Sequence, residues 1–263
     1  MGSVSTTLHF TECLHLHTCV AVDYGASLIV AKSGSTEEEQ GDGTDVSVSS
    51  KYMVVSDQSL ATGIPIGKRM PSAKVLNQSD ARPWHFQELL PSNGRWRVAI
   101  FAGDIRQPEQ KKKLDFVGEA LDSKDSFLRR FTPSGAAHDA VFELLAIHNA
   151  PRTETTIFDL PEVFRHFDKV EGWDYWKIYV DDVSYHEGFD NFYKTFGVSS
   201  SGCAVIIRPD QYVSYIGPMD DVESLNKFFS GFMRNAPSEE ANKLANGAIA
   251  SGGVGDIADL RIA

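Results

Sequence analysis

The stretch DDVSYHEG at residues 181–188 holds the side chains best suited to chemistry, directly after an apolar run that predicts a strand. A carboxylate such as Asp182 beside a histidine such as His186 can hold the imidazole in one tautomer and make it a general base. The hydroxyl of Tyr185 can polarise a carbonyl or a phenol. Because loops at strand ends gather functional groups in α/β proteins, these three residues are the candidate catalytic residues. The alternative is that the carboxylate and the imidazole only fix the loop.

Three further side chains are candidates for binding a substrate. Arg208 could bind an anion, although an ion pair with Asp210 that fixes the turn RPDQ is favoured by the habits of turn aspartates. Trp176, in the aromatic group at 173–179, could face an aromatic ligand or a dimer partner, but core packing is favoured. His148 ends an apolar run and could line a pocket or be an ordinary hydrogen-bonded histidine. The same two interpretations apply to His138 and His166.

Thiol, metal and flavin chemistry are not expected of this chain. A reactive thiolate needs a site such as CxxC at a helix N-terminus, but the predicted strand at 95–102 is followed by AGDIRQPEQKKK. Cys203 begins an apolar run, where an inert buried thiol is the default. No GxGxxG motif lies between a predicted strand and a helix, so no cofactor is expected. No standard zinc spacing is matched by Cys13, His15, His17 and Cys19.

Composition excludes several classes of partner. The chain has 263 residues, of which 42% are hydrophobic, so it can bury a sizeable core, and its net charge is −11. No basic face of the size that nucleic acids require is present. No apolar stretch approaches the ~20 residues that cross a bilayer, and no secretory signal is present. Three cysteines are a sparse, odd set that suits a reducing compartment, so we expect a cytoplasmic protein.

Strands alternate with helices along the chain, which predicts an α/β domain. The predicted strands are a strand within 20–31 interrupted at Gly25, one beginning at Val75 and Leu76, and those at 95–102, 142–148, 176–180, 203–207 and 212–216. The predicted helices are 109–121, a piece within 124–139, a short helix starting at Asp159, 189–196, and a closing helix with Asp220 and Asp221 at its N-terminus.

The predicted domain organisation has three parts. Residues 1–67 form an N-terminal arm, within which the acidic, low-complexity stretch at 33–50 is expected to be disordered. Residues 68–235 form the α/β domain. Residues 236–263 are rich in alanine, glycine, asparagine and serine and are expected to be a flexible tail.

A predicted strand, the turn RPDQYV, a second strand and LxxFF on the closing helix follow one another at 202–234. This order resembles the C-terminal domain of flavin-dependent phenol hydroxylases (phenol 2-monooxygenases), and the stretches 63–105, 159–164 and 177–198 agree with it. The resemblance implies a thioredoxin-like (peroxiredoxin-like) α/β fold, with a mixed sheet and flanking helices, and a homodimer. It also implies that flavin and substrate domains would precede this part, so that the chain is a stand-alone domain without them.

Two functions stay open, because fold does not fix function. The first is a flavin-free, cofactor-independent acid–base enzyme, such as an isomerase, cyclase, dehydratase or lyase. The resemblance suggests an aromatic or polyketide-like metabolite as its substrate. The second is a non-catalytic module that dimerises with, or stabilises, a flavin monooxygenase. Histidines near strand ends favour the enzyme, which requires a mostly apolar pocket of about 300 Å³ or more between the arm and the domain. A solid core there would favour the module.

Overall fold

The computed structural model describes residues 22–32, 54–188 and 190–236. The predicted acidic loop, the segment with Cys13 and Cys19, and all of the predicted tail except Ala236 lie outside these residues. The division into arm, domain and tail therefore stays a prediction.

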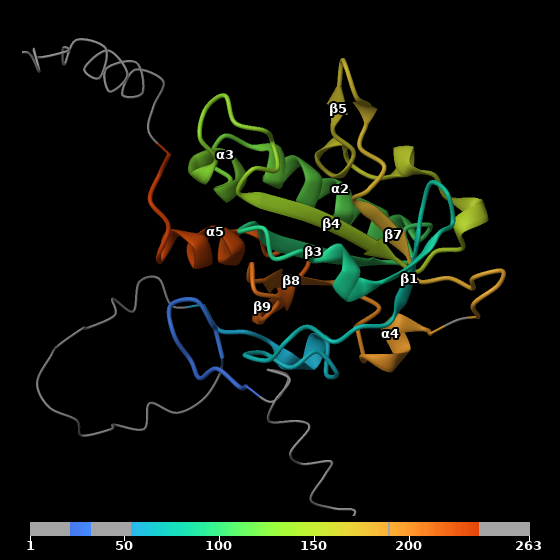
Figure 1. Cartoon of the computed structure of the whole chain (residues 1–263), viewed down its shortest axis with the longest axis horizontal. Helices are drawn as coiled ribbons and strands as arrows, with labels where there is room; N and C mark the ends of the chain where they lie inside the picture. Colours follow the sequence, from blue (N-terminus) through green and yellow to red (C-terminus); the bar gives the residue numbers. More distant parts are fainter. Residues whose placement is uncertain (1–21, 33–53, 189, 237–263) are drawn as a thin grey trace, which may run out of the picture.

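A mixed sheet of seven strands forms the centre of the described part, in the order β2-β1-β7-β4-β3-β8-β9 (Figure 1). Strands β3, β4 and β7 are parallel, and β8 and β9 continue the sheet as an antiparallel hairpin. A separate two-stranded hairpin, β5–β6, stands away from it. The strands are β1 (Lys74–Asn77), β2 (Pro83–His85), β3 (Trp96–Gly103), β4 (Phe142–His148), β5 (Phe167–Asp168), β6 (Gly172–Trp173), β7 (Ile178–Val180), β8 (Cys203–Ile207) and β9 (Val213–Pro218).

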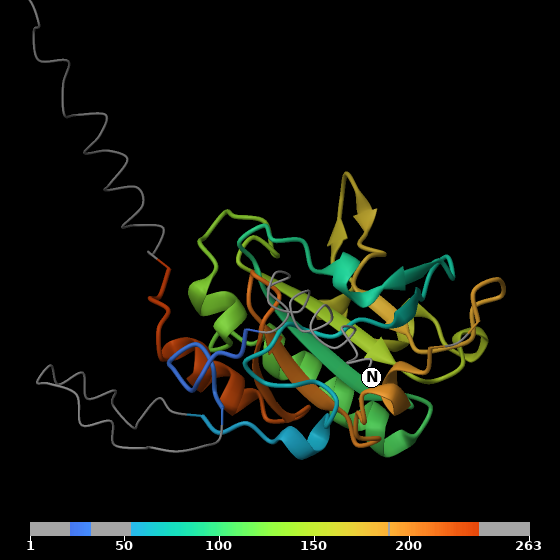
Figure 2. The ribbon, with the colours of Figure 1, turned by 60° about the horizontal axis from the view of Figure 1, so that its bottom comes forward.

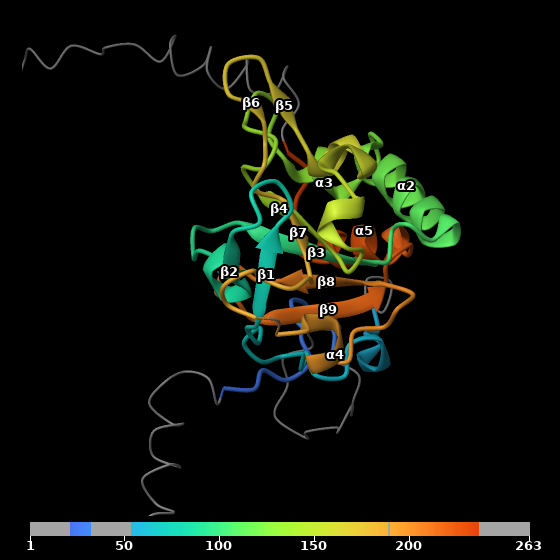
Figure 3. The ribbon, with the colours of Figure 1, turned by 90° about the vertical axis from the view of Figure 1, so that its right-hand side faces the viewer.

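Helices and irregular segments cover both faces of the sheet (Figure 3). The α-helices are α2 (Pro108–Asp122), α3 (Phe127–Phe131), α4 (Phe192–Thr195) and α5 (Val222–Ser230). The 3-10 helices are η2 (Gln58–Leu60), η3 (Phe86–Leu89), η4 (Arg152–Glu154), η5 (Ile157–Asp159) and η6 (Glu162–Phe164).

Side-chain alternation along β3 divides the core into two layers. Val98 and Ile100 pack with α2, α3 and α5 on one face, whereas Ala99 and Phe101 pack with η3, α4 and the segment 54–73 on the other. A β3-α2-β4 unit followed by a β8-β9-α5 unit is the thioredoxin-like arrangement, so the predicted fold is confirmed.

The segment 54–67 runs along the outer edge of β9 (Figure 2). The backbone N–H of Asp57 donates to the carbonyl of Ile216 at 2.8 Å, and that of Gly67 donates to Val213 at 2.9 Å. The N–H of Ala31 donates to Ser214 at 2.7 Å. The two segments 22–32 and 54–67 share this edge, and neither forms a ladder with β9, so the strand predicted within 20–31 is wrong for the described residues 22–32.

The short helix predicted to start at Asp159 is also wrong in its boundary. The Asp159 carboxylate accepts hydrogen bonds from the backbone N–H of Thr156 at 2.7 Å and from its hydroxyl at 3.0 Å. Asp159 is therefore the last residue of η5, where it completes the capping box with Thr156 at the N-terminus of that turn. The next turn, η6, begins after Pro161.

Candidate functional site

The loop that carries the candidate catalytic residues follows β7, as predicted. One carboxylate oxygen of Asp182 accepts the backbone N–H of Arg152 at 2.9 Å, and the other accepts that of Val183 at 2.7 Å. Both oxygens therefore hold loop backbone. Among the described residues, no hydrogen bond or ion pair joins this carboxylate to the ring of His186, so Asp182 does not orient that imidazole.

Tyr185 and His186 lie at the tip of this loop, where Ser184 and Gly188 pair across a tight turn. The two rings meet edge to face with centroids 4.6 Å apart, and the tyrosine is 94% exposed. Together with Arg152 and Glu187 they line a small recess of about 210 Å³. Tyr185 and His186 thus line the same recess, which Asp182 does not. The catalytic roles of these three residues stay predictions.

Asp181 has a structural role at the start of α4 that the sequence analysis did not predict. It is buried, and its two oxygens accept the backbone N–H groups of Phe192 and Tyr193, each at 2.8 Å, at the start of α4. Burial raises the pKa of this carboxyl, and the two hydrogen bonds act against that shift. Tyr193 in turn donates its hydroxyl to the carbonyl of Ile147 at 2.7 Å, which ties α4 to the central strand β4.

His148 is completely buried at the end of β4. Its Nε2 lies 3.1 Å from the side-chain oxygen of Gln78. The amide of Gln78 donates to the carbonyl of Thr155 at 2.7 Å. Burial lowers the pKa of His148 to about 4, so the imidazole is neutral at pH 7. This arrangement anchors the 151–155 loop to the sheet, and His148 lines neither the recess nor the groove described below.

Arg208 and Trp176 do not come together with His148. Arg208 pairs with Asp210 at 2.6 Å and lies over the ring of Tyr24, which confirms the interpretation that the pair fixes the turn. Trp176 is 52% exposed and packs edge to face on Trp84, so the favoured interpretation of core packing is wrong for it. The substrate-binding roles of Trp176 and Arg208 stay predictions.

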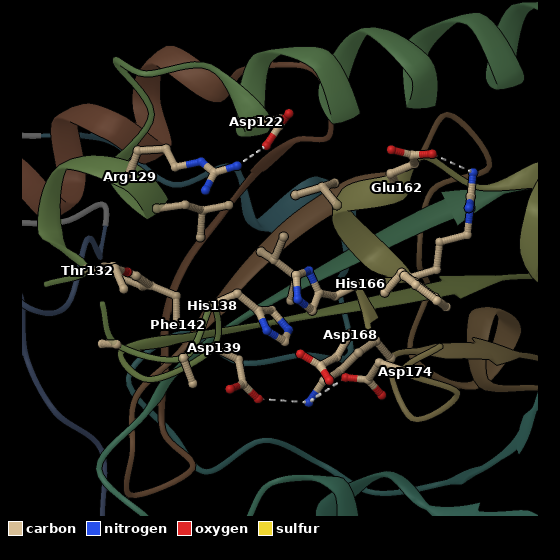
Figure 4. A pocket seen from close by; sticks show the side chains of 18 of the residues that line it. Asp122, Arg129, Thr132, His138, Asp139, Phe142, Glu162, His166, Asp168 and Asp174 are labelled. Atoms are coloured by element: carbon tan, nitrogen blue, oxygen red, sulfur yellow. Dashed lines mark hydrogen bonds and ion pairs between the residues drawn. The ribbon is translucent and has the colours of Figure 1, made fainter. Parts of the chain in front are cut away.

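A wide, open groove of about 1770 Å³ lies between α3 and the β5–β6 hairpin (Figure 4). Within it, His138 and His166 stack with their centroids 3.8 Å apart. Burial lowers the pKa of His138, and the neighbouring imidazole of His166 adds to this shift. Nearby, Lys177 lies 3.4 Å from Asp139 and 3.7 Å from Asp174. Burial alone would raise the pKa of Asp139, but Lys177 and Arg95 lower it.

Residues 22–237 match the family model of the phenol hydroxylase C-terminal dimerisation domain. The chain belongs to this family. The match covers the central sheet, both of its covering layers and the candidate loop, so the resemblance found in the sequence is confirmed.

Curated relatives of this dimerisation domain are flavin or aromatic monooxygenases. The FAD-dependent monooxygenase terD of Aspergillus terreus is 36% identical over 181 residues, which are 68% of this chain and 30% of that protein. The phenol 2-monooxygenase fsqG of Aspergillus fumigatus is 35% identical over 73% of this chain and 32% of its own length. The 3-hydroxybenzoate 4-monooxygenase of Comamonas testosteroni is 38% identical over 68% and 28%. The chain thus spans about a third of the length of these relatives.

Solved structures similar to the dimerisation domain include a thiol:disulfide interchange protein from Bacteroides sp., with 12% identity and a TM-score of 0.39. That comparison covers 66% of this chain and 93% of the other. Peroxidoxin BcpB from Mycobacterium tuberculosis has 13% identity and a TM-score of 0.38, over 62% and 95% of the two chains.

Cys203 is the cysteine that lies within the described residues. Cys203 is buried in β8, as predicted, and burial raises its pKa to about 12, so the thiolate does not form near neutral pH. No group of three or more metal-ligating side chains occurs in the ranges 22–32, 54–188 and 190–236. In the same ranges, no helix has the length and hydropathy to cross a bilayer.

Proposed function

We propose that this chain is a non-catalytic dimerisation module that pairs with a second copy of itself and stabilises a flavin monooxygenase. The observation that carries the proposal is the match to the phenol hydroxylase C-terminal dimerisation domain over residues 22–237. The monooxygenases that share this domain are about three times as long as the matched region, so the partner is a chain with the flavin chemistry of those relatives.

A pocket between the N-terminal arm and the domain was expected of an enzyme. The packing of side chains at this place supports the module instead. Between the segment 54–73 and the sheet, the space is filled by buried side chains, among them Ile64, Met70, Phe101 and Val205. All four are fully buried. Dense packing of this kind between the segment 54–73 and the sheet supports the module.

Dimer formation tests the proposal directly. Sedimentation velocity at micromolar concentration is expected to give a species of about 58 kDa, which is twice the 29.0 kDa of one chain. Dilution should shift the boundary towards the monomer mass, because association depends on protein concentration. A chain that sediments as a 29.0 kDa monomer up to about 100 μM would contradict the homodimer.

An acid–base enzyme is the second candidate, and the recess lined by Tyr185 and His186 favours it. A volume of about 210 Å³ suits a small monocyclic aromatic molecule better than a larger metabolite. Incubation of the protein with phenols and aromatic ketones, without cofactor, should then give a product seen by mass spectrometry. His186→Ala is expected to slow turnover about 100-fold, whereas His166→Ala, outside the recess, should not. Equal rates in wild type and His186→Ala would exclude this site.

A further inference from the structure

The β5–β6 hairpin projects from the rest of the domain (Figures 1 and 3). Phe158 and Phe167 are more than half exposed, and Val170 at the hairpin turn is 92% exposed. The hairpin pairs with no other strand of the described residues. An isolated two-stranded hairpin is only marginally stable, and a cluster of exposed apolar side chains marks a surface that another molecule covers.

Contacts at the base of the hairpin fix its orientation relative to the rest of the domain. Trp173 packs against Phe158 and Phe167, with ring centroids 5.5 Å and 4.8 Å away. The guanidinium of Arg165 lies 5.1 Å from the Trp173 ring centroid. At the turn, the Asp168 carboxylate accepts the backbone N–H groups of the residues that follow Lys169. The hairpin is therefore a preformed arm, which lowers the entropic cost of binding.

The turn of the hairpin and the helix α3, on opposite sides of the groove, carry charges of opposite sign. The hairpin wall is acidic, since Asp168 and Glu171 outnumber Lys169. The opposite wall, on α3, carries Arg129 and Arg130. Figure 4 shows Arg129 and Asp168 on opposite sides of the stacked histidine pair. Arg129 is 60% exposed although it pairs with a neighbouring aspartate, so it can reach a second partner.

A surface with an acidic apolar arm on one side and a basic rim on the other is complementary to itself. A two-fold axis brings the same patch of both copies together, so each arm meets the rim of the other copy. Two symmetric contacts also double the buried area, which helps to reach the ~1,600 Å² of a standard interface.

We propose that the groove between α3 and the β5–β6 hairpin is the dimer interface, and that its occupant is the hairpin of a second copy of this chain. Val170 then lies in the partner's groove, and Glu171 faces Arg129 of the partner subunit. This assignment rests on the homodimer of the proposed function. It adds the surface through which the two copies associate.

A charge-swap experiment tests the surface. Val170→Asp and Glu171→Arg, both at exposed positions, are each expected to raise the dimer dissociation constant at least about tenfold in sedimentation velocity. Arg129→Glu should do the same, because every change acts twice in a symmetric dimer. The double variant Arg129→Glu/Glu171→Arg restores opposite charges and should return the constant to within about threefold of wild type.

Phe116→Asp is the matched control, because Phe116 is 55% exposed on α2 and does not line the groove. Circular dichroism melts of each variant exclude unfolding as the cause of dissociation. A wild-type dimer that Val170→Asp and Glu171→Arg leave intact would overturn this surface and keep the proposed homodimer. The groove would then be covered by another occupant, such as the chain that continues from Ala236 on its rim or a monooxygenase. A monomeric wild type would overturn both.

Discussion

Replacing Arg97 by alanine is expected to lower the free energy of unfolding by about 3 kcal/mol. Arg97 is completely buried on β3, directly opposite Glu143 on β4, and their side chains pair at 3.0 Å. The guanidinium also donates to the side-chain oxygen of Asn93 at 2.8 Å and to the carbonyl of Arg95 at 3.2 Å. Removal of one partner of a buried ion pair costs about 3–5 kcal/mol. The lower end applies, because Lys177 still pairs with Glu143.

Urea denaturation followed by circular dichroism measures this loss. The matched control is the double variant Arg97→Met/Glu143→Met, which removes both charges and keeps side-chain volume. Its free energy of unfolding should lie within about 1 kcal/mol of wild type, because apolar replacements of a buried pair are often neutral. A single Arg97→Ala variant as stable as wild type would show that this pair does not hold β3 and β4 together.

Lowering the pH from 7 to 4 is expected to remove about 3 kcal/mol of stability through His148. Its pKa is about 4 in the folded protein and about 6.5 in an unfolded chain. Between these values the unfolded state binds a proton that the folded state does not, so stability falls as the pH falls through 6.5. The loss is complete near pH 4, since each unit of difference contributes about 1.4 kcal/mol.

His148→Gln should flatten the stability profile between pH 6.5 and 4, because glutamine does not titrate. Asp104 and Asp168 have pKa values lowered by hydrogen bonds, so their contribution is lost only at lower pH and remains in the variant. His138→Gln separates the contribution of the histidine in the groove, whose pKa is also lowered. The assignment fails if urea midpoints of wild type and His148→Gln change in parallel over this range.

The spacing of apolar residues in the sequence predicted those strands and helices in which the pattern is strong. The apolar runs of β3, β4 and β8 and the helical spacing of α2 and α5 placed these elements to within a few residues. The β5–β6 hairpin was missed, because strands of two residues have no period. It forms through tertiary contacts of Phe158, Arg165 and Trp173, which no local pattern reveals.

The place of the candidate loop after a strand was predicted, but the hydrogen bonds of its two aspartates were not. All three residues of β7 are buried, so alternation could not show which of the two following aspartates turns inward. Asp181 is the buried one, and Asp182 binds loop backbone. His138 and His166 lie before and after β4 and are far apart in sequence, so no local pattern could show that their rings stack.

The attachment of residues 54–67 along β9 decides how this protein can be cut into fragments. A chain beginning at Lys68 would expose the carbonyls of Val213 and Ile216 as free acceptors. An unpaired strand edge of this kind can pair with strands of other molecules and lead to aggregation. A fragment meant to stay in solution must therefore keep residues 54–67, and a fragment that also keeps residues 22–32 retains the bond from Ala31 to Ser214.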